Sequence, residues 1–219
     1  MTPLTPNECR VLGVLVEKAQ TTPAQYPLTL NALVAGCNQK NNRDPVTELS
    51  EDDVLEALDG LRAKGLAREV DMAGSRVPKY RHVAREGLSV DTNQLVVLTE
   101  LLLRGPQTVG EIRGRAGRMH PLESVEVVEN ILDSLITREF PLVKRLSPLP
   151  GTRAERFQQM LCPALHPVQA AAPSGGGGPV APVRPVTDAA LQQRVAALEA
   201  EVASLRALLE AAGFTSDAV

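Results

Sequence analysis

The residue types that carry acid–base and nucleophilic chemistry are present in this chain, but their spacing does not form an active site. The three histidines, His82, His120 and His166, are far apart, and none lies beside a nucleophile or an acid in a known pattern. Each is expected to be a surface or turn residue. No glycine-rich phosphate loop and no paired-cysteine motif is present. The sequence therefore predicts a non-enzymatic protein without a cofactor or a metal.

The most unusual polar stretch runs from residue 38 to residue 45. Asn and Asp bond readily to their own backbone, so a long turn explains the composition. Amide and guanidinium groups also suit phosphate oxygens and base edges, so the alternative is a contact surface for nucleic acid, a ligand or the rest of the chain. The side chains of that surface would be Asn38, Gln39, Lys40, Asn41, Asn42 and Arg43.

Other basic residues lie where they could contact the backbone of a nucleic acid. They flank two predicted β-hairpins and cluster on one predicted helix. Hairpins can grip phosphates without reading sequence, whereas scattered solubilising charge is the competing explanation. The residues are Arg76, Lys79 and Arg81 at the first hairpin, Lys144, Arg145, Arg153 and Arg156 at the second, and Arg113, Arg115 and Arg118 on the helix.

Carboxylates dominate the polar side of two further predicted helices, which span residues 50–64 and 122–139. A carboxylate is repelled by phosphate and reads a base edge only in restricted cases, so insertion of these helices into a DNA major groove is disfavoured. Their polar sides are either ordinary solvated surface or a docking face for a basic protein. The carboxylates are Asp52, Asp53, Glu56 and Asp59 in the first helix, and Glu126, Glu129 and Asp133 in the second.

These residues are carried by one order of elements that occurs twice. Each copy has three helices followed by two strands around a turn, and a Leu-Asp-x-Leu motif marks the third helix at Leu58 and at Leu132. The pattern predicts a mainly α fold with small β-wings, made of two tandem winged-helix domains over 1–86 and 87–162. The helices are expected from about residues 5, 29, 50, 92, 108 and 122, and the strands over 66–70, 79–83, 142–146 and 155–161.

The last part of the chain has a different composition. Residues 163–187 are rich in Pro and Gly, which predicts a flexible linker. Residues 188–212 have apolar side chains at heptad spacing, which predicts an amphipathic helix. Pairing with a second copy in a parallel coiled coil, and thus a homodimer, competes with docking on its own chain. The seam would consist of Leu191, Val195, Leu198, Val202, Leu205 and Leu209.

Composition limits the class of partner. The 23 Lys and Arg against 26 Asp and Glu give a net charge of −3, without the basic excess typical of nucleic-acid binding proteins. Aromatic residues are too scarce for a platform that stacks single-stranded bases. The sparse cysteines suit a reducing compartment, and the sequence lacks a signal-like start or a membrane-length apolar run. We therefore expect a cytoplasmic protein that does not enter a membrane.

Three stretches resemble a known bacterial family. Residues 26–33 with 37–45 look like the signature of the YceH family, and residues 77–82 and 4–13 also fit. The resemblance covers about residues 3 to 162. It implies a tandem winged-helix protein with a C-terminal helical tail, and it carries no assigned activity.

Two functions are compatible with these patterns. The first is a dimeric regulator that binds DNA through its wings and the 38–45 turn. The second is a protein-interaction adaptor that uses its acidic third helices, similar to the acidic tandem winged helices of the segregation and condensation protein ScpB, which serve assembly. Winged helices perform several roles, so the expected fold does not choose between them.

Overall fold

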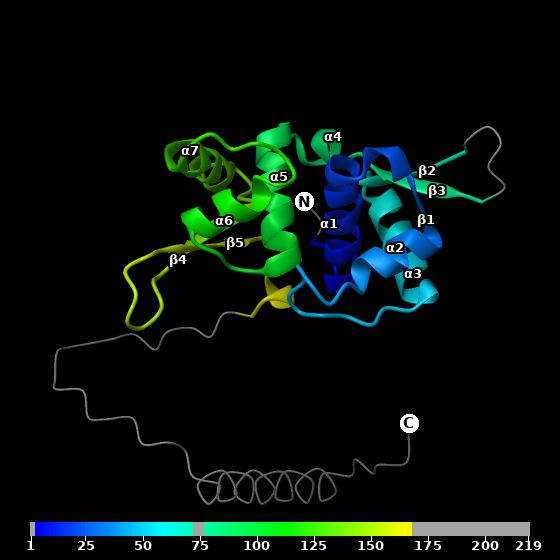
Figure 1. Ribbon diagram of the computed structural model, residues 1–219, viewed down its shortest axis with the longest axis horizontal. Helices are drawn as coiled ribbons and strands as arrows, with labels where there is room; N and C mark the ends of the chain where they lie inside the picture. The colour runs from blue at the N-terminus through cyan, green and yellow to red at the C-terminus, as the bar shows by residue number, and fades with distance from the viewer. Residues whose placement is uncertain (1–2, 72–76, 168–219) are drawn as a thin grey trace, which may run out of the picture. The chain divides into compact units, whose positions relative to one another are not determined.

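The computed structural model describes residues 3–71 and 77–167 of the chain. The described residues form a mixed α and β fold with seven α-helices and two small antiparallel sheets (Figure 1). The first copy of the predicted order contains α1 (Pro6–Thr21), β1 (Leu28–Thr29), α2 (Leu30–Cys37), α3 (Glu51–Ala63), β2 (Ala67–Val70) and β3 (Lys79–His82). The short α4 (Ala84–Leu88) leads to the second copy, which contains α5 (Thr92–Arg104), α6 (Val109–Ala116), α7 (Val125–Ile136), β4 (Val143–Leu146) and β5 (Arg156–Gln159).

Helix starts follow the capping residues in the sequence. The side chains of Thr5, Ser50, Asp91 and Thr108 each accept a hydrogen bond from the backbone N–H three residues on, and the third residue bonds back to the cap. Such reciprocal boxes satisfy N–H groups that the helix itself leaves unpaired. The third helix of the second copy begins at Val125, later than the expected Leu122, because Ser124 is the residue that caps it.

The two sheets share one arrangement. In the first copy β3 lies between β1 and β2, and both pairings are antiparallel. In the second copy β4 pairs with β5, and Gln107 forms an isolated bridge to Phe157 of β5. Gln107 directly precedes the cap of α6, as β1 directly precedes α2. The repeated order therefore includes a third strand position, which the sequence pattern did not predict.

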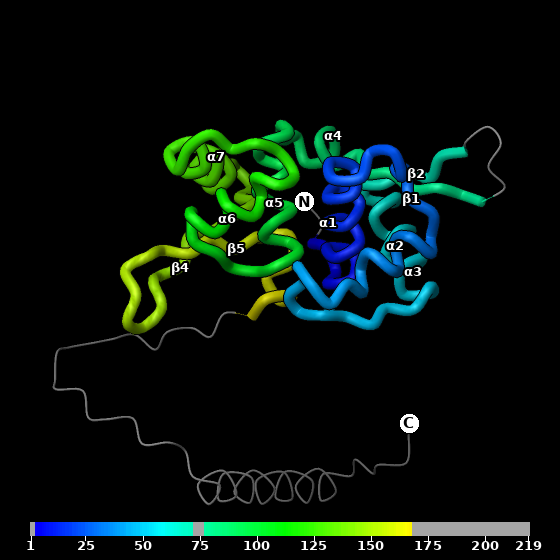
Figure 2. Tube along the Cα trace, viewed as in Figure 1, coloured from blue at the N-terminus to red at the C-terminus, as the bar shows by residue number. Residues whose placement is uncertain are grey.

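The first helices of the two copies, α1 and α5, pack against each other (Figure 2). A Cβ atom on Gly13 would lie 2.8 Å from Leu103 Cδ2, so glycine is what permits this close approach. Every residue from Glu8 to Val16 is buried, as is every residue from Leu95 to Leu103. Each helix was expected to bury one face, but α1 packs against α2 and α3 on one side and α5 on the other. The expected separate domains thus form one compact unit.

The compact unit extends beyond residue 162, where the flexible linker was expected to begin. Residues Pro163–Leu165 form a 3₁₀ helix. The His166 ring is buried and lies 2.5 Å from the Asp44 carbonyl oxygen, and Gln158 donates a hydrogen bond to the His166 carbonyl. Residues 168–187 of the predicted linker, the predicted heptad helix at 188–212 with its seam, and Arg76 of the first hairpin lie outside the described residues.

Candidate functional site

Two residues of the polar 38–45 turn are committed to internal contacts. The Asn38 side chain accepts a hydrogen bond from the Leu49 N–H and donates one to the Leu49 carbonyl. Arg43, whose side chain is 0% exposed, forms an ion pair with Glu17 of α1 at 2.5 Å and donates to the Gly36 carbonyl. Both side chains therefore fasten the turn to its surroundings.

The exposed part of the turn lies beside the arginine cluster of α6. A hollow of about 270 Å³ opens where the turn, α1, α5 and α6 meet, and we call it the junction pocket. It brings together Gln39 and Asn42 with Arg115 and Arg118, whereas Arg113 bonds to the Glu123 carbonyl and does not line it. The lining residues are Glu17, Lys18, Thr21, Gln39, Asn42, Glu100, Arg115, Arg118 and Met119, with Lys40 and Asn41 exposed on the turn.

The acidic third helix of the first copy lines a groove of about 720 Å³, the α3 groove. Small residues of α3, Ala57, Gly60 and Ala63, alternate along it with carboxylates. Gly60 is required because a Cβ atom there would lie 2.0 Å from Oε1 of Glu8, a buried residue that pairs with Lys64. No Lys or Arg is among the described residues that line this groove. The lining residues are Thr5, Pro6, Asn7, Glu8, Asp53, Glu56, Ala57, Asp59, Gly60 and Ala63.

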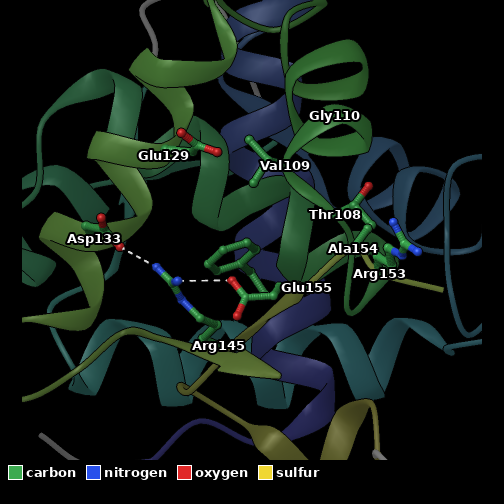
Figure 3. A pocket seen from close by; sticks show the side chains of 10 residues that line it. Thr108, Val109, Gly110, Glu129, Asp133, Arg145, Arg153, Ala154 and Glu155 are labelled. Atoms are coloured by element: carbon green, nitrogen blue, oxygen red, sulfur yellow. Dashed lines mark hydrogen bonds and ion pairs between the residues drawn. The ribbon is translucent and has the colours of Figure 1, made fainter. Parts of the chain in front are cut away.

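The acidic third helix of the second copy lines a comparable groove of about 680 Å³, the α7 groove. Figure 3 shows that Arg145 of β4 lies between Asp133 of α7 and Glu155 of the hairpin, at 2.9 and 3.0 Å. Its guanidinium also lies 5.5 Å from the centre of the Phe157 ring, a cation–π distance. The lining residues are Thr108, Val109, Gly110, Glu129, Asp133, Arg145, Arg153, Ala154, Glu155 and Phe157.

The other carboxylates predicted on the two third helices differ in their hydrogen-bond and ion-pair partners. Asp53 lines the α3 groove but also caps α3, and hydrogen bonds from Ser50 lower the pKa of its carboxyl. Asp59 is paired with the exposed Arg62 at 3.1 Å, whereas Glu56 has no ion-pair partner among the described residues. Asp52 and Glu126 are exposed outside both grooves.

The predicted basic residues of the hairpins do not share one site. Lys79 and Arg81 lie on β3 without an ion pair in the described part of the chain, beside Arg68 of β2, which sequence reasoning missed. In the second hairpin Arg145 and Arg153 line the α7 groove, Lys144 lies on β4, and Arg156 lines a separate hollow with His166.

Comparison with known proteins identifies relatives over most of this structure. The sequence pattern of one family, described as a protein of unknown function, DUF480, matches residues 4–152. The chain belongs to the DUF480 family. It is 48% identical over 200 residues to a UPF0502 protein of Geobacter sulfurreducens, covering 90% of this chain and 88% of that one. It is 45% identical over 212 residues to a UPF0502 protein of Shewanella pealeana, covering 94% and 97%.

Two histidines and two cysteines of this DUF480 protein have buried environments that shift their pKa values toward the neutral form. Burial lowers the pKa of His82 to about 4 and also lowers that of His166. His166, expected as a surface or turn residue, directly follows the 3₁₀ helix and is buried because the chain after β5 packs back onto Asp44. Burial raises the pKa of Cys37 to about 12 and strongly raises that of Cys9, so both thiols stay protonated at neutral pH.

The described residues contain neither a candidate metal cluster nor a membrane-spanning helix. Within 3–71 and 77–167, no three His, Cys, Asp or Glu side chains are grouped so that they could hold a metal ion. No helix in those ranges is long and apolar enough to cross a bilayer.

Sequence reasoning missed five residues of the junction pocket, namely Glu17, Lys18, Thr21, Glu100 and Met119. One signal was available for Glu100, because it is the only charged residue in the largely apolar Leu95–Leu103 segment. Its burial raises the pKa of the carboxyl. The α3 and α7 grooves were anticipated only as acidic faces, since their hollow shape depends on neighbouring elements.

Proposed function

We propose that this DUF480 protein is a non-enzymatic, tandem winged-helix adaptor whose two acidic grooves bind basic segments of a protein partner. The observation that carries the proposal is that α3 and α7, the third helices of the two copies, each line a groove with carboxylates. An acidic groove attracts basic side chains and repels the phosphates of nucleic acid.

The α7 groove supports this reading because it already holds a guanidinium. Arg145 bridges carboxylates of α7 and of the β4–β5 hairpin and stacks near Phe157. Guanidinium groups favour such paired carboxylates and aromatic faces. A partner arginine in the α3 groove would find carboxylates on α3 and a floor of small residues that allows its backbone to approach closely.

The winged-helix part of the proposal rests on element order. Each copy has three helices and a terminal β-hairpin, with an additional strand or bridge before its second helix. This order agrees with the resemblance to the YceH family. In DNA-binding relatives of such folds the third helix enters the major groove, but carboxylates at that position oppose phosphate contact.

Charge reversal in the α3 groove tests the adaptor function. We expect the Glu56→Lys, Asp59→Lys variant to lose most partner recovery in a quantitative pull-down from cells. The matched control is Glu86→Lys, an exposed change on α4 outside both grooves. Asp53 is left unchanged because it caps α3. Equal recovery of the same partner by the double variant and the wild type would reject the α3 groove as its docking site.

DNA binding is the second candidate, and one observation favours it. Arg68, Lys79 and Arg81 lie on the first hairpin, and within the described ranges none has an ion-pair partner. Cations of this kind can hold phosphate without reading sequence. Anisotropy with random duplex at low salt should then show binding that weakens in an Arg68→Gln, Arg81→Gln variant. Absence of binding at micromolar protein would exclude this candidate.

The homodimer is proposed from the heptad spacing of residues 188–212 alone. A chain ending at Ala172 should then have the mass of a monomer in light scattering, while the full chain has that of a dimer. Equal oligomeric states of the two chains would exclude this segment as the dimerisation element.

A further inference from the structure

The junction pocket is rich in hydrogen-bond donors from both copies. Lys18 of α1 and the amides of Gln39 and Asn42 come from the first copy, and Arg115 of α6 and Arg118, two residues after that helix, come from the second. These side chains are far apart in the sequence and meet only because α1 packs on α5. Ammonium, guanidinium and amide groups together form a donor set for an oxyanion.

The two carboxylates of the pocket already face cations that lie outside its lining. Glu17 pairs with Arg43 at 2.5 Å, and Glu100 pairs with Arg104 at 3.3 Å. Arg115 has a weak contact with Glu111 at 3.5 Å and donates a hydrogen bond to the Gln107 side-chain oxygen at 2.7 Å. Lys18 and Arg118 have no ion-pair partner in residues 3–71 and 77–167. The pocket therefore keeps uncompensated positive charge after its own carboxylates are counted.

The positive charges also crowd one another. Burial lowers the pKa of Arg104, and the neighbouring positive charges of Arg118 and Arg115 lower it further, opposed only by Glu100 and Glu17. Glu100 is almost fully buried, and its Oε1 faces the Arg104 guanidinium at 3.3 Å. A bound anion would reduce the repulsion among these guanidinium groups, since opposite charge stabilises each of them.

We propose that the junction pocket binds a phosphate group, carried either by a small phosphorylated molecule or by a nucleic-acid backbone. A tetrahedral phosphate offers several acceptor oxygens, which suits donors that converge from α1, the turn and α6. The hollow of about 270 Å³ is at the small end of ligand sites, so it accommodates a compact phosphorylated group. Because the donors come from both copies, the ligand would bridge them.

Inorganic pyrophosphate is the first probe, titrated into the full chain by calorimetry without divalent cations or phosphate buffer. We expect one site per chain. Arg118→Gln should weaken binding on the order of tenfold, since it removes a charged donor, and Lys18→Gln should weaken it severalfold. Arg113→Gln, at an arginine of α6 outside the pocket, is the matched control and should change the affinity less than about twofold. Circular dichroism melting verifies that the variants fold.

The methionine methyl groups give a readout that is independent of affinity. Met119 lines the pocket, whereas Met160 follows β5 and does not. In a chain with labelled methionine methyls, pyrophosphate should shift the Met119 resonance and leave that of Met160 in place. Shifts of equal size at both methyls, or at neither, would contradict binding in the junction pocket.

A competition experiment separates the two sources of phosphate. If random duplex DNA displaces pyrophosphate and its binding also weakens in Arg118→Gln, the pocket holds a backbone phosphate. If pyrophosphate binds and DNA does not displace it, the ligand is a small phosphorylated molecule. The proposal is overturned if neither probe binds at millimolar concentration, or if both bind equally well to wild type, Arg118→Gln and Lys18→Gln.

Discussion

The contact between first and third helix is built with charge in one copy and without it in the other. In the first copy Glu8 of α1 is buried, lies against Gly60 of α3 and pairs with Lys64. At the equivalent place in the second copy, Gln94 of α5 donates to the Ser134 hydroxyl of α7 at 2.9 Å. Equivalent positions in one element order thus carry a buried ion pair and a neutral hydrogen bond.

The two copies also differ in the charged residues in and beside their grooves. The residue of the second copy equivalent to Lys64 is Arg138, which donates to the Leu88 and Ser89 carbonyls and so fastens the end of α7 to the end of α4. The first copy keeps a carboxylate at the head of the α3 groove, with no basic residue among the described residues that line it. The second copy contains Arg145 in its groove. The comparison teaches that the α3 groove is the better candidate for an incoming basic segment.

The largest effect is expected from replacing Gly60. A Cβ atom at this position would displace the buried Glu8 carboxylate, so Gly60→Ala should lower the free energy of unfolding by about 2–4 kcal/mol. Ser134→Ala, at the equivalent position, loses two exposed hydrogen bonds, from the Gln94 amide and to the Ile131 carbonyl, and should cost about 1 kcal/mol. Urea unfolding measures both. Equal losses of unfolding free energy in the two variants would contradict the proposed difference between the copies.

The hairpins should differ in their response to acid. His82 ends β3, and Gln159 ends β5 at the equivalent place. Burial lowers the pKa of His82 from its ordinary 6.5 to about 4, so the unfolded chain takes up this proton first as pH falls. The contribution of His82 to the free energy of unfolding is therefore fully present above about pH 6.5. It decreases by roughly 2 kcal/mol toward pH 4, after allowance for the partial exposure of the ring.

The variant His82→Gln places glutamine in the first hairpin, as Gln159 stands at the equivalent position of the second. Its unfolding free energy should fall less steeply between pH 6.5 and pH 4, and the remaining slope includes His166, whose pKa burial also lowers. Urea unfolding at several pH values measures the slopes. Identical slopes for wild type and variant would show that His82 is not protonated differently in the folded and unfolded chains.

Neutralising Glu8 makes the first copy resemble the second. Glu8→Gln leaves the partly exposed Lys64 without its carboxylate, and we expect a loss of about 1–2 kcal/mol. A double variant that also carries Lys64→Met should recover part of the loss, because no unpaired charge remains. The reverse change, Gln94→Glu, should give no gain, since no ion-pair partner is placed for it. A gain of stability in Gln94→Glu would contradict this assignment.

The smallest effect on stability is expected at Arg145. Its two ion pairs are about half exposed, so Arg145→Gln should cost less than about 1 kcal/mol. The change frees Asp133 and Glu155, so an arginine-rich peptide should bind the variant more tightly than wild type in an anisotropy titration. Unchanged binding would show that Arg145 does not compete with a partner for the α7 groove.

Much of the fold could be predicted from local signals. The caps at Thr5, Thr29, Ser50 and Thr108 and the leucine spacing determine most helix starts, because these interactions lie within a few residues. The two-residue β1 and the five-residue α4 are too short for a periodic pattern. The close packing of α1 on α5 depends on tertiary contacts that spacing does not encode.

The sites were predictable only in part. Carboxylates on the third helices were recognised, since helical spacing separates their polar side from the apolar one. Arg43 was grouped with exposed contact residues, but its side chain is buried and forms an ion pair with Glu17 of α1. The junction pocket combines residues that are far apart in the sequence, such as Lys18 and Arg118, and no local pattern links them.

Photocrosslinking in the α3 groove tests the central claim most directly. Ala63 lines the groove and is exposed, so a benzoylphenylalanine at this position should form adducts with a partner in living cells, whereas the same residue at the exposed Ala35 of α2 should not. We expect mass spectrometry to place the crosslink in a Lys- and Arg-rich segment of that partner and Glu56→Lys to suppress it. Absence of adducts, or adducts that persist in Glu56→Lys, would contradict a role for the α3 groove in binding a basic partner.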